Sequence, residues 1–200
     1  MERPPAEPDI DAKIAAAIER LSRVSRVLLQ DAVKRRGLSP IQALMLTYLD
    51  TRGPEVAHVS HLAREFGLTQ ATVSDSVSSL EAKGLVLRER SLDDGRMTRL
   101  RLTPAGRRLA QELAMWDEPL REAVAAASPL ERERALFFLL ELIGRLQRRG
   151  VISVARVCVT CRFFERDAHP DPRAPHHCNL LDRPLPVSGL RVDCPEYEAA

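Results

Sequence analysis

Apolar positions near the start of the chain recur with the period of an α-helix. Between Asp9 and Gly37 they fall three and four residues apart, at Ile10, Ile14, Ile18, Leu21, Val24 and Leu28. This spacing predicts one long helix, and Gly37 is placed to end it after three basic residues. Residues 1–8 hold three prolines and no apolar pattern, so they are predicted to form a frayed arm.

The next segments predict a helix-turn-helix. Ser39-Pro40 indicates a helix start, because serine caps a helix and proline fits its first position. That helix is expected to end near Gly53-Pro54. A short helix over residues 58–67 closes with a glycine, and a second over residues 69–83 opens at a threonine cap. Two short helices joined by a tight Gly-Leu turn have helix-turn-helix geometry.

A β-hairpin is predicted directly after these helices. Residues 85–90 and 98–103 alternate or are apolar over the length of a strand. Between them, Asp93–Arg96 carries the Asp-Gly pair that is typical of a hairpin turn. A hairpin in this position is called the wing of a winged helix.

Two more helices are predicted after the wing. Thr103-Pro104 caps the first, which is expected to run to about Ala127, and Ser128-Pro129 caps the second, which is expected to run to about Arg149. The second has a larger apolar face than a small winged helix needs, with Leu136, Phe137, Leu140, Ile143 and Leu146. The predicted fold is therefore mainly α with a small β-hairpin wing: a winged helix-turn-helix with long flanking helices.

Composition changes at Gly150. Residues 151–200 contain six of the fourteen prolines, all four cysteines and no lysine. The predicted organisation is a disordered arm over residues 1–8, a winged-helix domain over residues 9–150 and a cysteine-rich irregular tail over residues 151–200.

The net charge of +2 is too small to name a partner. Neither a long apolar run nor a secretory signal is visible, so we expect a cytoplasmic protein away from the membrane.

Small polar side chains near the start of residues 69–83 suit the DNA major groove. Gln70 could pair with adenine, Ala71 could meet a thymine methyl, and Asp75 could accept from cytosine N4. The candidate groove residues are Thr69, Gln70, Ala71, Thr72, Ser74, Asp75 and Ser78. Lys83 and Arg64 are candidates for phosphate contacts.

Arginines crowd the predicted wing, at Arg88, Arg90, Arg96, Arg99 and Arg101. An arginine at the wing tip suits a narrow minor groove, where the negative potential is strongest. Arg96 and Arg99 are candidate DNA contacts on the wing.

These residues resemble the MarR family of bacterial transcription regulators. The resemblance lies in Leu62-Ala63, Thr72-Val73-Ser74, Leu80–Val86, Asp94-Gly95-Arg96 and Leu102–Gly106. It implies a homodimer whose first and last two helices intertwine as dimerisation helices. It also implies binding to a palindromic operator in double-stranded DNA, usually as a repressor relieved by a ligand or chemical signal. By the family pattern, Arg96 is the wing residue expected in the minor groove. Many members carry a basic residue where this chain has Asp75, a departure that bears on base preference and not on DNA binding.

The four cysteines follow a metal-ligand spacing, Cys158-x2-Cys161-x16-Cys178-x15-Cys194. A Cys-x2-Cys pair can clamp one metal, and two further cysteines complete a four-thiolate site. Zinc and an iron–sulfur cluster both fit four thiolates. A cluster is favoured over zinc by the single Cys-x2-Cys pair, the Cys194-Pro195 dipeptide and the lack of lysine. His177, next to Cys178, could replace one of the cysteine ligands. The other histidines of the tail, His169 and His176, are expected to be ordinary loop residues.

The sequence therefore predicts a DNA-binding regulator that senses redox, iron or metal state through its tail. One alternative is a repressor that responds to a small phenolic molecule, held in a cleft near Leu28, Leu49 and Trp116, with a purely structural zinc tail. A redox protein is a further alternative, although Cys158 and Cys161 lack the βαβ context of a thioredoxin-type pair. An enzyme is not expected, because no nucleophile–base pair, acid dyad or Gly-rich phosphate loop is visible.

Overall fold

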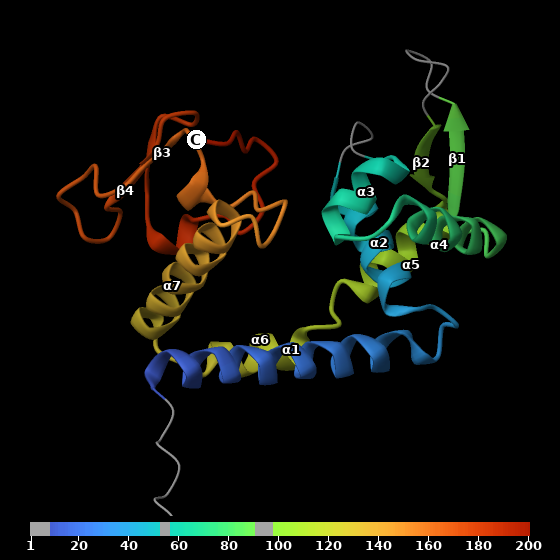
Figure 1. Cartoon of the computed structure of the whole chain (residues 1–200), viewed down its shortest axis with the longest axis horizontal. Helices are drawn as coiled ribbons and strands as arrows, with labels where there is room; N and C mark the ends of the chain where they lie inside the picture. The colour runs from blue at the N-terminus through green and yellow to red at the C-terminus, as the bar shows by residue number, and fades with distance from the viewer. Residues whose placement is uncertain (1–8, 53–56, 91–97) are drawn as a thin grey trace, which may run out of the picture. The chain divides into compact units, whose positions relative to one another are not determined.

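The computed structural model describes residues 9–52, 57–90 and 98–200, which form two compact units. The first unit contains α1, α2, most of α4, the wing and α5. The second contains α3, the first residues of α4, α7 and the tail. The divisions fall at Ala57/His58, Val73/Ser74 and Arg121/Glu122. Because α7 lies in the same unit as the tail, these divisions do not coincide with the predicted boundary at residue 150 (Figure 1).

In the first unit, α2 (Pro40–Thr51) packs against α1 (Ile10–Lys34) and α5 (Pro104–Leu113). Serine and threonine caps set the starts of two of these helices. Ser39 forms a capping box with Gln42 at the start of α2, and the Thr103 side chain accepts the Gly106 N–H at the start of α5. The core is aliphatic, and its fully buried members include Met45, Leu46, Leu80, Val86 and Leu113.

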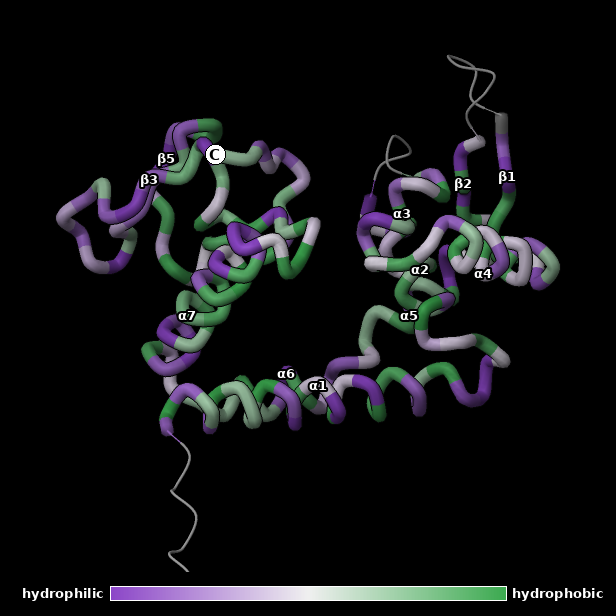
Figure 2. Tube along the Cα trace, in the orientation of Figure 1, coloured by the Kyte–Doolittle hydropathy of each residue, from purple (hydrophilic) through white to green (hydrophobic). Residues whose placement is uncertain are grey.

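The long helix α1 leaves most of its apolar face exposed. It buries only Leu29 and Val33. The exposed apolar residues lie along the rest of the helix and include Ile10, Ile18, Leu21, Val24 and Val27. Figure 2 shows these hydrophobic positions interleaved with hydrophilic ones along α1.

The wing is a two-stranded antiparallel sheet. Strand β1 (Val86–Arg90) pairs with β2 (Thr98–Leu102), with Val86 opposite Leu102 and Arg90 opposite Thr98. The predicted turn at Asp93–Arg96 lies outside the described residues. The side chain of Thr103 joins the wing to α5, since its hydroxyl donates to the Gly84 carbonyl at 2.7 Å.

The single helix predicted from Thr103-Pro104 to about Ala127 is wrong. Two helices occupy this segment, α5 and α6 (Glu118–Ala125), with a turn from residue 114 to residue 117. Pro119 explains the break, because it has no N–H to donate and its ring would clash with the carbonyl four residues earlier, that of Met115. The helix therefore restarts with the proline in its first turn.

In the second unit, the cysteine tail packs against α7 (Pro129–Arg148). Leu140 of α7 is buried with Val157, Leu185 and Leu190 of the tail. Gly144 permits a close approach, since a Cβ there would lie 2.8 Å from the Thr160 methyl carbon. Part of the apolar face of α7 thus covers the tail, while Leu130, Phe138 and Leu139 stay exposed.

The tail is more regular than the sequence indicated. It contains a three-stranded antiparallel sheet of β3 (Phe164–Glu165), β4 (His176–Cys178) and β5 (Arg183–Leu185), in that order. Two 3-10 turns complete it, η2 (Cys158–Thr160) and η3 (Val187–Gly189), and both contact α7. No helix in the described part of the chain is long and apolar enough to span a membrane.

Candidate functional site

The turn between α3 (Val59–Phe66) and α4 (Gln70–Ala82) presents the residues that were predicted to contact DNA. Gly67 ends α3 in the left-handed conformation, with φ of 62°. Thr69 Oγ1 then accepts the Thr72 N–H at 3.1 Å and so caps α4, and it also lies 2.9 Å from Thr72 Oγ1. The exposed side chains over the first two turns are Gln70, Ala71, Thr72 and Asp75.

Arg88 ties the wing to α4, a role that sequence reasoning missed. Its Nε donates to Glu81 Oε2 at 2.8 Å, and its Nη2 donates to Ser78 Oγ at 3.0 Å and to the Ser74 carbonyl at 3.2 Å. Ser78 is therefore engaged within the protein. The two-residue period of a strand could have indicated this role. Arg88 lies two residues after the buried Val86 and therefore on the same face of β1.

The other basic candidates differ in their surroundings. Lys83 Nζ donates to Ser79 Oγ at 3.0 Å, and Arg64 is exposed on α3. Arg99 is half-buried on β2. Arg101 pairs with Glu89 across the wing at 3.2 Å. The predicted minor-groove residue Arg96 lies outside the described residues.

All four cysteines line one small cavity in the tail. Cys158 lies in η2, Cys161 follows it, Cys178 ends β4, and Cys194 lies in the last segment. The cavity has a volume of about 30 Å³, and its other lining residues are Phe163, Phe164, Leu180, Leu185 and Glu196. None of these four cysteines forms a disulfide, and each thiol is half-buried. The fold thus gathers cysteines that lie up to 36 residues apart in the sequence.

Two hydrogen bonds from Arg191 reach the sulfur atoms. Its backbone N–H donates to Cys158 Sγ at 3.1 Å, and its guanidinium Nη1 donates to Cys194 Sγ at 3.5 Å. Burial raises the pKa of the Cys158 thiol, and the Arg191 N–H opposes this rise. Donors of this kind stabilise a thiolate, which is the form that binds metal.

The four thiols border one cavity. Within the described ranges, no group of three or more His, Cys, Asp or Glu side chains is arranged to hold a metal ion. A single zinc ion needs its ligands to converge, because Zn–S bonds of about 2.3 Å bring the sulfurs within about 4 Å of one another. Four thiolates are a donor set that suits zinc or an iron–sulfur cluster, and apart from Glu196 the rest of the cavity lining is apolar.

The histidines of the tail lie outside the lining of the cysteine cavity. His177 Nδ1 lies 3.0 Å from His169 Nε2, and His177 Nε2 lies 3.4 Å from Asp182 Oδ1. His176 is buried rather than exposed in a loop, and its ring stacks on Phe137 with centroids 5.4 Å apart. Burial lowers the pKa of His176, which favours its neutral form.

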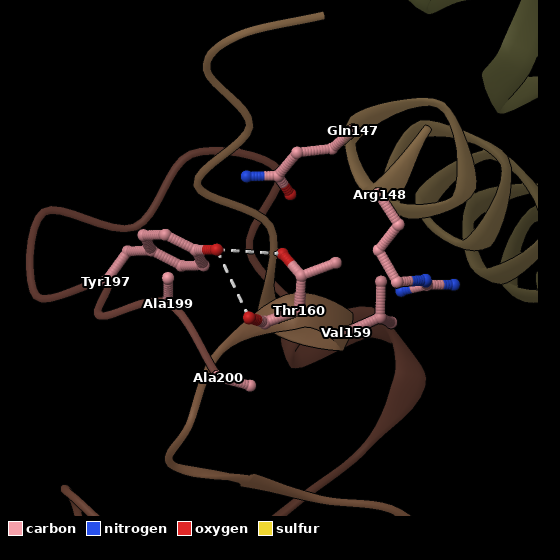
Figure 3. Close-up of a pocket in the computed structure, with 7 residues that line it drawn as sticks. All are labelled: Gln147, Arg148, Val159, Thr160, Tyr197, Ala199 and Ala200. Atoms are coloured by element: carbon pink, nitrogen blue, oxygen red, sulfur yellow. Dashed lines mark hydrogen bonds between the residues drawn. The ribbon is translucent and has the colours of Figure 1, made fainter. Parts of the chain in front are cut away.

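Two larger cavities flank α7. One of about 300 Å³ is lined by residues of α7, η2 and the last segment, where the Tyr197 hydroxyl is hydrogen-bonded to Thr160 Oγ1 and the Thr160 carbonyl, each at 3.1 Å (Figure 3). The other, of about 560 Å³, is an open cleft that includes Phe137 and Phe138. Neither cavity, nor the cysteine cavity, is lined by the described residues Leu28, Leu49 or Trp116, so the predicted phenolic cleft stays a prediction.

The order of helices, turn and wing defines a winged helix-turn-helix protein. A model of the MarR family matches residues 36–97. The chain is also 34% identical over 102 residues to the uncharacterized HTH-type transcriptional regulator YxaD of Bacillus subtilis, which covers 48% of this chain and 70% of that one. The chain belongs to the MarR family of transcription regulators, and the resemblance noted from the sequence is confirmed.

Solved structures share the fold. The S. aureus MepR–DNA complex matches with a TM-score of 0.60 and 21% identity, over 70% of this chain and 100% of that one. A probable transcriptional regulator from Pseudomonas aeruginosa matches with a TM-score of 0.54 and 30% identity, over 67% and 99% of the two chains. BldR from Sulfolobus solfataricus gives a TM-score of 0.55 and 26% identity, over 70% and 99%. About a third of this chain therefore has no counterpart in these structures.

Proposed function

We propose that this chain is a homodimeric, cytoplasmic repressor that binds palindromic double-stranded DNA and senses its metal or redox state through the four cysteines. The observation that carries the DNA-binding part is the start of α4. There, Gln70, Ala71 and Asp75 are exposed on a helix that Arg88 fixes to the wing. Membership of the MarR family supports this, as does the fold shared with MepR, a protein solved as a complex with DNA.

The exposed apolar residues of α1 and α7 support the homodimer. Five large apolar residues of α1 and three of α7 remain at least one-third exposed. Exposed apolar positions at helical spacing are typical of an interface between subunits. The helix that would enter the major groove, the recognition helix, is α4. In a symmetric dimer the two copies of α4 would meet two half-sites of a palindrome, separated by about one DNA turn or a multiple of it.

We place an iron–sulfur cluster on Cys158, Cys161, Cys178 and Cys194. The apolar lining and the Arg191 donors to two of the sulfur atoms support this placement. Hydrogen bonds to the sulfurs and exclusion of solvent are features by which proteins tune such groups. A bound cluster would join three segments of the tail, those that carry Cys158 and Cys161, Cys178, and Cys194.

The test has a metal part and a DNA part. Protein purified without oxygen is assayed for iron, acid-labile sulfide and zinc per chain, and a duplex is selected from a random pool. Affinity is then measured for that duplex and for a scrambled one at the same salt concentration. Iron and sulfide with a preference for the selected duplex are expected.

Two results would change this proposal. Colourless protein with one zinc per chain would refute the cluster and favour the alternative, a repressor that responds to a small molecule and has a structural zinc tail. Equal affinity for the two duplexes would refute sequence-specific DNA binding.

Substituting Gln70, Ala71 and Asp75 one at a time tests which bases each position reads. Loss of a base contact is expected to reduce the free energy of DNA binding by about 1–3 kcal/mol.

A further inference from the structure

One ion pair joins the cysteine tail to the first helix of the helix-turn-helix. Arg156 Nη2 donates to Glu65 Oε2 on α3 at 2.7 Å, and Arg156 Nε donates to Asp193 Oδ1 at 2.8 Å. The side chains of Arg156 and Glu65 are each only 17% exposed. One guanidinium therefore holds a carboxylate of α3 and a carboxylate of the tail together.

The tail end of this link is built on two cysteine-bearing segments. Arg156 lies two residues before Cys158, and Asp193 directly precedes Cys194. The Cys194 N–H donates to the Arg156 carbonyl at 2.9 Å, and the Cys158 N–H donates to the Arg191 carbonyl at 3.1 Å. Any change in the separation of Cys158 and Cys194 therefore moves the residues that orient Arg156.

The backbone around Arg156 cannot reorient independently of the tail. Ala155 is 7% exposed and Val157 is 1% exposed, on either side of Arg156. Val157 belongs to the apolar cluster that includes Leu140 of α7. A close-packed segment transmits a displacement to its neighbours instead of absorbing it.

The far end of the link belongs to the part of the chain that was predicted to read DNA. The second compact unit includes residues 58–73 together with the tail. This range contains α3, the turn and the start of α4 with the predicted contacts Thr69, Gln70, Ala71 and Thr72. The cysteine site and the first turn of the recognition helix are thus parts of one compact unit.

The geometry points to the Arg156–Glu65 pair as the link through which occupancy of the four-cysteine site sets the position of α3 and, with it, operator affinity. This inference rests on the proposed function, since it requires both DNA binding and a group on the cysteines. With the site filled, Cys158 and Cys194 are held at a fixed separation and Arg156 is held against Glu65. With the site empty, nothing bridges Cys158 and Cys194 directly, their segments can separate, and α3 loses the guanidinium that positions it.

The test compares two Glu→Ala variants of the full chain. Glu65→Ala removes the link, and Glu198→Ala removes a control ion pair inside the tail, in which Arg162 Nη1 donates to Glu198 Oε2 at 2.7 Å. Each protein is studied as purified without oxygen and again after chelators have removed the metal. Metal content, hydrogen exchange of residues 58–73 and affinity for the selected duplex are measured in both states. The conservative variant Glu65→Gln serves if Glu65→Ala does not fold.

In the wild type, metal removal is expected to speed exchange in residues 58–73 and to weaken DNA binding roughly 10-fold, a common size for coupling between sites. Glu65→Ala with full metal content should match the metal-free wild type in both measurements and respond little to metal removal. Glu198→Ala should respond like the wild type.

The outcomes separate this inference from the proposed function. A Glu65→Ala protein that keeps the 10-fold response overturns the inference, as does metal-loaded wild type whose α3 exchange is unchanged by metal removal. Neither result bears on whether the chain holds a metal or whether it binds DNA. Absence of both iron and zinc refutes the metal part of the proposed function first, and the inference with it.

Discussion

Gly106 is the point at which α5 comes closest to the start of the wing, and replacing it with alanine should destabilise the first unit. A Cβ at Gly106 would lie 2.0 Å from the Leu85 carbonyl oxygen, whereas Cβ atoms essentially never approach within 3.0 Å of another heavy atom. The obstacle is backbone, so no side-chain rotation relieves it. The helix would have to move away from the Gly84–Leu85 segment by about 1 Å.

That movement strains the contacts that fix α5 to the wing. Thr103 N–H donates to the Leu85 carbonyl at 3.0 Å, and Thr103 Oγ1 donates to the Gly84 carbonyl at 2.7 Å. Overpacking of this kind costs about 1–3 kcal/mol, and each weakened hydrogen bond costs about 0.5–1.5 kcal/mol. Alanine in a helix otherwise gains about 0.5–1 kcal/mol over glycine. We therefore expect a net loss of about 1–5 kcal/mol for Gly106→Ala, by combining these ranges.

Urea denaturation followed by circular dichroism measures this change, with the slope checked to be unaltered. Ala105→Gly is the matched control, because Ala105 is an exposed neighbour in α5 and carries the reverse substitution. It should lose only the propensity difference, about 0.5–1 kcal/mol. If Gly106→Ala were as stable as the wild type or more stable, the steric argument would be refuted.

Three further predictions concern the tail and the wing. Leu140→Ala should cost about 2–5 kcal/mol in the second unit, because Leu140 is fully buried against the tail, and faster proteolysis after residue 150 would reveal it. Gly144→Ala should loosen the same packing by pressing on the Thr160 methyl group, and thermal unfolding with metal content would report the loss. Arg88→Met should weaken DNA binding by releasing the wing from Glu81 on α4, while an unchanged affinity would show that this contact does not position the wing.

Much of the fold was predictable because its determinants are local. Ser39, Thr69, Thr103 and Ser128 were expected to cap helices, and the side chain of each accepts a backbone N–H three residues later. The same logic failed around Pro119. Its effect is also local, but the helical pattern continues on both sides of it and hides the break that its missing N–H causes.

The candidate sites were predictable only in part. Spacing identified the four cysteines as a set, and they line one cavity. Spacing could not show that the thiols surround a hollow, because the positions of Cys178 and Cys194 depend on the tail sheet and its packing. The sequence placed Arg88 among five wing arginines but did not predict its contact with Glu81, because only the folded hairpin brings these two side chains together.

The sequence by itself determined the order of helices, the caps, the wing and the family, since each depends on residues a few positions apart. The tertiary structure decided which distant residues meet. Arg156 and Glu65 are 91 residues apart, and nothing in the pattern near either one indicates the other. Such a contact forms only when the packing of α7, the tail and α3 has closed a long loop, whose entropic cost is offset by the whole packed unit and not by local propensity.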